Sequence, residues 1–143
     1  MRMRNAIVID ADPQQIYLRA GNTESWPQIL PHYRYVRVLR RDGDRALVEM
    51  AAWREAGAVR IPVRWRAEQQ NDPSIPQIFF RHLQGWTSGM LVYWRFVPLA
   101  HGGTRVEIDH ELHSPLAPFI GRYFIDPIAT KTLGCIKRAC EEK

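Results

Sequence analysis

The segment from Gly85 to Leu112 constrains the fold most strongly, because it holds two long alternations of apolar and polar residues joined by the turn His101-Gly102-Gly103. In the second alternation one side carries only charged residues, namely Arg105, Glu107, Asp109 and Glu111. A period of two with charge on one side only predicts a β-strand with one solvent-exposed face and one buried face. We therefore predict that the two runs are neighbouring antiparallel strands. The face that they bury carries Met90, Val92, Trp94 and Phe96 from the first run and Thr104, Val106, Ile108, His110 and Leu112 from the second.

The chain before this hairpin predicts a strand, two short helices and four further strands. The first strand spans residues 5–9, and Asp12 followed by Pro13 predicts a helix that reaches about Ala20, because aspartate caps a helix and proline suits its first turn. A second short helix is expected over residues 25–30. From Tyr33 onward the period becomes two, which predicts strands over 33–41, 45–53, 59–68 and 77–84, the first two joined by the turn Asp42-Gly43-Asp44.

Two of these strands have irregular patterns. In strand 59–68 the alternation points Trp65 inward and leaves Arg64 and Arg66 outside, whereas Pro62 predicts a bend or a local break, because proline in a strand usually marks an edge or a bulge. The pattern of strand 77–84 does not show which of its faces is buried, since both faces carry apolar residues. One face holds Ile78, Phe80 and His82, the other Phe79, Arg81 and Leu83.

The residues after the hairpin predict one long amphipathic helix from Leu116 to about Glu141, with apolar residues at spacings of three, four or seven. Pro127 removes a backbone donor and clashes with the preceding turn, so we expect a kink between Tyr123 and Pro127. The stripe expected to face the sheet holds Phe119, Ile120, Tyr123, Phe124, Ile128, Leu133, Ile136 and Cys140.

This order of elements predicts an α+β fold in which a seven-stranded antiparallel sheet curves around the C-terminal helix. A flat sheet of that size would have more inner surface than the helices can cover, so it must bend, and we expect a cavity between sheet and helix. The 143 residues fit a single domain over residues 1–143.

Composition narrows the class of protein. The net charge of +5 comes from 17 arginines and three lysines against 15 acidic residues, and alternation places most of the arginines on an outer sheet face interleaved with glutamates. No nucleic-acid-binding motif accompanies them, and we expect neither nucleic acid nor integral membrane association. Cys135 and Cys140 diverge around a helix and are not expected to bond to each other. Together with the absence of a signal-peptide pattern, this predicts a soluble cytoplasmic protein.

Several short motifs carry a family resemblance across essentially the whole chain. They are Ile7-Val8-Ile9-Asp10-Ala11-Asp12-Pro13, Trp26-Pro27, Leu30-Pro31-His32-Tyr33, Asp42-Gly43-Asp44, Gly85, Trp94-Arg95-Phe96 and Gly102-Gly103-Thr104-Arg105-Val106. In their order and spacing the chain resembles the START-like or Bet v 1-like superfamily (SRPBCC, the helix-grip fold), and within it the polyketide cyclase/dehydrase family.

The resemblance implies a pocket for an apolar or aromatic small molecule. Members include aromatase/cyclases, which assist aldol ring closure and dehydration of poly-β-ketones, and carriers of lipids or ubiquinone-like molecules, so the fold does not settle the function. In the cyclases, the pocket is thought to use aromatic walls from the short-helix segment, a tyrosine just after it and an inward arginine on the middle strand. Trp26 and Tyr33 match the first two by position. The arginine is missing unless Pro62 shifts the register and turns Arg64 or Arg66 inward.

Candidate functional residues follow from the buried face and the resemblance. His110 is the one ionisable residue on the buried face of its strand, and we take Tyr33 and His110 as the candidate catalytic residues. The alternative is that His110 is a core histidine that hydrogen-bonds to a hydroxyl or backbone group and has no catalytic role. We expect no metal site, because His110 and His113 point to opposite faces, and no phosphate or dinucleotide motif predicts a cofactor. The candidate ligand-binding residues are Trp26, Met50, Trp65, Trp94, Tyr123 and Phe124.

Three functional hypotheses stay open. The first is a protein that binds an aromatic or polyketide-like molecule and assists its cyclisation and dehydration; the second is a non-catalytic carrier of a lipid or a ubiquinone-like molecule. The third is an interaction module that uses the arginine-rich outer face. The expected partner is a hydrophobic small molecule. The sequence leaves the oligomeric state open, and a homodimer is one of the alternatives.

Overall fold

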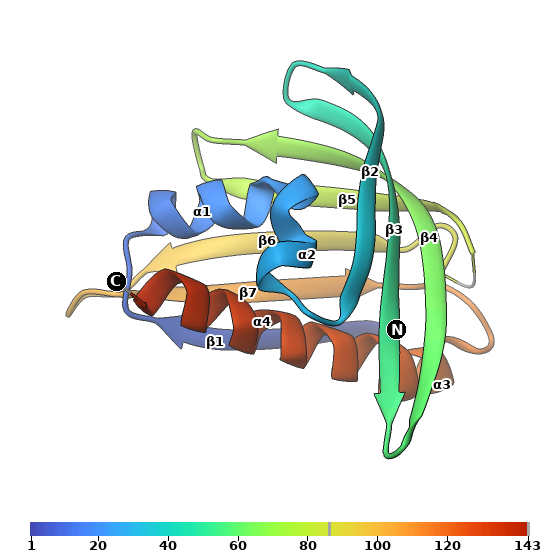
Figure 1. Cartoon of the computed structure of the whole chain (residues 1–143). Helices are drawn as coiled ribbons and strands as arrows, with labels where there is room; N and C mark the ends of the chain where they lie inside the picture. The colour runs from blue at the N-terminus through green and yellow to red at the C-terminus, as the bar shows by residue number, and fades with distance from the viewer. Residues whose placement is uncertain (86, 143) are drawn as a thin grey trace.

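The computed structural model describes residues 1–85 and 87–142, in which a seven-stranded antiparallel sheet curls around a C-terminal helix (Figure 1). The order of the strands across the sheet is β1-β7-β6-β5-β4-β3-β2, so β1 and β2 form its edges. The first half of the chain contains β1 (Arg2–Ile9), α1 (Pro13–Gly21), the 3-10 turn η1 (Thr23–Ser25), α2 (Trp26–Ile29), β2 (Tyr33–Asp42), β3 (Arg45–Ala56) and β4 (Val59–Asp72). The second half contains β5 (Gln77–Gln84), β6 (Leu91–Pro98), β7 (Thr104–Glu111), α3 (Ala117–Ile120), the π-helical segment η2 (Gly121–Ile125) and α4 (Asp126–Glu141).

The alternating hairpin forms β6 and β7 as predicted. The two strands pair antiparallel with Val92 opposite His110, and the residues predicted to be inside are buried on the face toward α4. The same face of the sheet continues onto β5, where Ile78, Phe80 and His82 are buried while Arg81 and Leu83 are exposed. The structure thereby assigns the inner face of the strand that the pattern left open.

The segment after β1 forms the two short helices as predicted. The Asp12 carboxylate accepts a hydrogen bond from the Gln14 backbone N–H at 3.0 Å and so caps α1. The β2–β3 hairpin turns at Gly43, whose φ of +60° is the left-handed conformation that favours glycine. Figure 1 shows α1 and α2 over the sheet beside α4.

The local break, one of the two outcomes predicted at Pro62, is wrong. The pairing of β3 with β4 runs without a register shift from Arg45↔Gln70 to Ala56↔Val59, and Pro62 sits opposite Trp53. The proline is tolerated because β5 pairs with β4 only from Arg66 onward, so this end of β4 is an edge that can lack a donor.

The kink expected near Pro127 takes the form of the π-helical segment η2, which separates α3 from α4. In a regular helix the residue 127 N–H would donate to the Tyr123 carbonyl, but proline has no N–H. The Arg54 guanidinium on β3 donates to this carbonyl instead. The irregular helix is therefore tied to β3.

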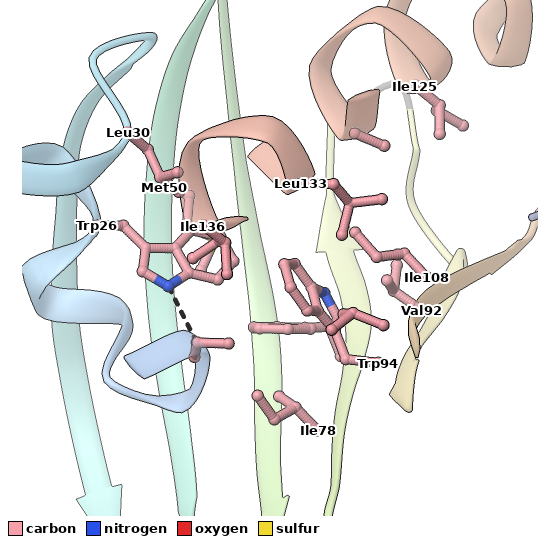
Figure 2. Packing of buried hydrophobic residues seen from close by; sticks show 14 of the residues in the cluster. Trp26, Leu30, Met50, Ile78, Val92, Trp94, Ile108, Ile125, Leu133 and Ile136 are labelled. Atoms are coloured by element: carbon pink, nitrogen blue, oxygen red, sulfur yellow. Dashed lines mark hydrogen bonds between the residues drawn. The ribbon is translucent and has the colours of Figure 1, made fainter. Parts of the chain in front are cut away.

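Helix α4 closes the core against the curved sheet. Figure 2 shows Leu133 and Ile136 of α4 facing Val92, Trp94 and Ile108 of the sheet. None of the described helices combines the length and apolar character needed to cross a bilayer. Cys135 and Cys140 are not bonded to each other, as predicted.

Candidate ligand-binding site

A cavity of about 290 Å³ lies between the inner face of the sheet and the helical segment from α3 to α4. Its lining is mostly apolar or aromatic. The residues that line it are Trp26, Tyr33, Met50, Ile61, Pro62, Val63, Arg64, Trp65, Phe80, His82, Thr87, Met90, Val92, Trp94, Ile108, His110, Ile120, Phe124, Ile125, Ile128, Ala129 and Thr132.

The cavity opens between β4 and the helical segment. Most of its lining is buried, but Ile61 and Val63 on β4 and Phe124 and Ile128 across from them are partly exposed. That end of β4 is also the part that β5 does not cover. A small molecule can therefore reach the cavity through this mouth without opening the sheet.

Four aromatic side chains form a continuous wall. The Trp26 ring packs edge-on against Tyr33 at a centroid distance of 5.0 Å and tilts against Trp94 at 5.7 Å, and Tyr33 packs edge-on against Trp65 at 5.9 Å. The indole N–H of Trp26 donates to the Ala20 carbonyl at 2.9 Å, which fixes the ring at the centre of this wall (Figure 2). Such a wall offers flat apolar faces and ring edges to an aromatic ligand.

The Tyr33 hydroxyl lies beside a polar cluster built around Thr132 of α4. The Thr132 hydroxyl donates to the Ile128 carbonyl at 2.7 Å, so the His32 Nε2, 2.8 Å from the same oxygen, must be the donor to Thr132. Burial raises the pKa of Tyr33 well above its usual value, and hydrogen bonding with Thr132 opposes that shift only in part. Tyr33 is therefore a neutral hydrogen-bond donor at every ordinary pH.

Two buried histidines stand on the sheet side of the cavity. Burial lowers the pKa of His110 to about 4, and burial with repulsion from His110 lowers that of His82 to about 3. The Nδ1 of His82 is 2.7 Å from the Thr87 hydroxyl, and its ring stacks on Trp65 at 5.7 Å. The Nδ1 of His110 is buried without a hydrogen-bond partner among the described residues. Both rings are neutral near pH 7, and each neutral ring has one nitrogen that accepts a hydrogen bond and one that donates.

The structure brings nearly all the predicted site residues together. Both members of the candidate catalytic pair, Tyr33 and His110, line the cavity, and so do the candidate ligand-binding residues Trp26, Met50, Trp65, Trp94 and Phe124. Tyr123 does not: its side chain is 44% exposed and its ring lies 4.9 Å from that of Phe119, which is 53% exposed. Both residues belong to the stripe predicted to face the sheet. Phe119 lies in α3 and Tyr123 in the π-helical segment η2 that follows it, and both side chains face outward instead.

The sequence reasoning missed three polar residues of the lining, His82, Thr87 and Thr132. His82 shares its strand face with Ile78 and Phe80, and that alternation was the available signal. Thr132 and Thr87 stand on a helix and in a loop where no pattern marked them. They supply part of the hydrogen-bonding capacity of an otherwise apolar cavity.

The inward arginine expected from the resemblance to aromatase/cyclases is absent from the described cavity wall. Because the register is continuous at Pro62, Arg66 points to the outer face, where its Nε donates to Glu49 at 3.1 Å. Arg64 borders the mouth but is exposed. The described residues also contain no group of three histidines, cysteines or acids that could hold a metal ion.

The chain matches the family model described as "Polyketide cyclase / dehydrase and lipid transport" over residues 9–137. The chain belongs to this family. No curated protein matches it significantly. The cavity of this family member lies between the sheet and the C-terminal helix, where the curvature of the sheet predicted it.

Solved structures with the same fold include proteins that are described in different ways. One is the protein TTHA0849 from Thermus thermophilus, with a TM-score of 0.77, 22% identity and coverage of 99% of this chain and 100% of that one. Another is the Zhui aromatase/cyclase from Streptomyces sp. R1128, at a TM-score of 0.73 and 13% identity, covering 97% and 95%. A third is a START superfamily protein from Mycobacterium smegmatis, with a TM-score of 0.74, 16% identity and coverage of 98% of this chain and 97% of that one. At these identities the likeness shows the fold alone.

Proposed function

We propose that this family member binds an apolar, ring-containing small molecule that carries hydroxyl or carbonyl oxygens. The observation that carries the proposal is that the aromatic wall of Trp26, Tyr33, Trp65 and Trp94 lines the same cavity as neutral hydrogen-bonding groups. The flat apolar faces of the wall can pack against the rings of a ligand, and Tyr33, His82 and His110 can hydrogen-bond to its oxygen atoms. A charged ligand fits poorly, because Arg64, the one charged residue among the described lining residues, is exposed at the mouth and does not compensate the desolvation of a charge in the interior.

The volume limits the size of the ligand. An apolar cavity of roughly 150 Å³ takes up one benzene molecule, so a cavity of about 290 Å³ suits about two fused rings. A longer chain would extend through the mouth between β4 and the helical segment. We therefore expect a bicyclic core, or one end of a polyketide-like chain, to occupy the interior.

A reaction of the family type would use Tyr33 and His110. His110 would take a proton from a methylene group between two carbonyls, the resulting enolate carbon would bond to a ketone carbon, and Tyr33 would protonate the oxygen formed there. In the dehydration, protonated His110 would give its proton to the leaving hydroxyl while the Tyr33 oxygen takes the remaining proton from the adjacent carbon, so that water leaves, a C=C bond forms and both side chains return to their neutral state. We propose this as the catalytic extension of the binding function.

A carrier without chemistry is the second candidate, in which the same cavity holds a lipid or a ubiquinone-like molecule. Two observations favour it: no arginine points into the cavity from β4, and a histidine with a pKa of about 4 is a weak base near pH 7. For either function we propose residues 1–143 as one domain in the cytoplasm, where two unbonded cysteines fit the reducing conditions.

Two measurements test the proposal. Native mass spectrometry of the protein purified from its own host should show a co-purifying apolar molecule, and its absence would count against a carrier. Product formation from a poly-β-ketone should fall in Tyr33→Phe and in His110→Ala. The matched controls are Tyr93→Phe on the outer face of β6 and His113→Ala, whose side chain is 78% exposed. Unchanged turnover in the two cavity variants would leave only the carrier.

A further inference from the structure

The segment from Leu116 to Ile125 is apolar on both of its faces. Ile120 and Ile125 are buried against the cavity, whereas Leu116, Phe119 and Tyr123 are 64%, 53% and 44% exposed on the opposite side. A helix that is apolar all round is normally buried on all sides. The outward face of this segment, which we call the outer lip (Leu116, Phe119 and Tyr123), is therefore left largely uncovered by the described residues.

The outer lip stands at the mouth of the cavity. The Phe119 ring packs 4.9 Å from that of Tyr123 and 6.2 Å from that of Phe124, and Phe124 lines the cavity. Apolar surface thus continues from the outside of the molecule into its interior. A hydrophobic ligand can follow this path without crossing open water.

The charge around the outer lip is positive. Arg122 is the charged residue within 116–125, and its guanidinium lies 5.5 Å from the Tyr123 ring centroid. Arg54 reaches the same turn through its bond to the Tyr123 carbonyl. Of the acids close to this region, Glu55 pairs with Lys131 at 3.1 Å, whereas Asp126 accepts from the neutral Asn5 amide at 2.8 Å and keeps its charge. Two arginines thus stand against one acid that no described cation pairs with, and the surface around the outer lip keeps a net positive charge.

We propose that the outer lip docks on the surface of an anionic lipid bilayer, so that an apolar ligand passes between the bilayer and the cavity. Exposed aromatic and aliphatic side chains flanked by arginines are the combination that binds such a surface peripherally. A second copy of the chain fits less well, because a two-fold contact at this patch would bring Arg54 and Arg122 close to their own counterparts. This inference rests on the proposed function, since it gives the cavity its source of ligand.

Vesicle flotation tests the docking. Vesicles of phosphatidylcholine containing about one third phosphatidylserine should carry the protein with them, whereas pure phosphatidylcholine vesicles should carry much less. The double variant Leu116→Ser/Phe119→Ser should bind the anionic vesicles at least about tenfold more weakly. The matched control is Leu18→Ser on α1, which removes an equally exposed leucine (67%) far from the mouth in sequence and leaves binding unchanged.

The charge is tested in the same assay. Arg122→Glu should weaken binding and reduce its salt dependence, while Arg19→Glu on α1 should have the smaller effect. Equal binding of all variants, or no binding of the unchanged protein, overturns the proposal. A dimer that dissociates in the double variant assigns the patch to a second copy and overturns it as well.

Uptake of 2-naphthol in the absence of vesicles separates this inference from the proposed function. The double variant should still bind 2-naphthol, because its substitutions lie outside the cavity. If the unchanged protein binds vesicles but no 2-naphthol, the proposed function fails while docking stands. If it binds 2-naphthol but not vesicles, docking alone fails.

Discussion

Acid should destabilise this protein through the two histidines that face the cavity. In the unfolded chain a histidine has a pKa of about 6.5, whereas in the folded protein burial lowers the pKa of His110 to about 4 and of His82 to about 3. Protonation therefore favours the unfolded state. The stability is fully present above about pH 6.5 and is lost as the pH falls toward the folded pKa values.

The size of the effect follows from these values. At about pH 5 the unfolded histidine is almost fully protonated and the folded one is almost fully neutral, which costs about 2 kcal/mol for each residue. The two together would remove about 4 kcal/mol, a large share of the roughly 5–15 kcal/mol that stabilises a domain. Buried His32, whose pKa is also lowered to about 4 by desolvation, adds to the loss.

Urea unfolding followed by tryptophan fluorescence measures this loss at about pH 7.5 and about pH 5. In His110→Gln, the difference in unfolding free energy between the two pH values should shrink by about 2 kcal/mol. The exposed His113→Gln should leave that difference unchanged. If His110→Gln retains the full pH dependence, His110 is not held neutral by burial and the description of the cavity wall is wrong.

Two further predictions concern the walls of the cavity. Trp26→Phe should lower the unfolding free energy measured in urea by about 2 kcal/mol, because it removes the hydrogen bond to the Ala20 carbonyl and leaves a void. A loss smaller than the error of the fit would contradict the central role of this ring. Arg54→Met should cost about 1 kcal/mol in the unchanged chain but clearly less in Pro127→Ala, which restores an N–H for the Tyr123 carbonyl. Additive effects in this double-mutant cycle would show that Arg54 does not replace the missing helix bond.

The fold could be predicted because burial and charge alternate so regularly along most strands. On β7 nearly every residue obeys the period, and a long strand with one charged face has only one way to join a sheet. The inner face of β5 could not be predicted for a related reason. Its outer face is also apolar, since Phe79 packs on Tyr93 of β6 at a ring distance of 5.0 Å, and this contact hides the alternation that marks His82 as inward.

The site could be predicted where residues stand on regular elements. Trp65, Trp94 and His110 follow the strand alternation into the cavity, and Trp26 follows the family resemblance. Tyr123 was misplaced because the prediction assumed α-helical spacing throughout, whereas a π-helical turn takes more residues and rotates the side chains that follow. Nothing in the spacing of single residues shows where such a turn begins.

We propose above that the cavity between the sheet and α4 binds an apolar ring compound. Isothermal titration of 2-naphthol into the unchanged protein and into Ala129→Phe tests it most directly, because Ala129 lines the cavity from α4 and a phenyl ring there would occupy much of the space. We expect saturable binding of 2-naphthol that is lost in Ala129→Phe while the cooperative unfolding transition remains. Equal binding by both proteins, or no binding by the unchanged one, would contradict it.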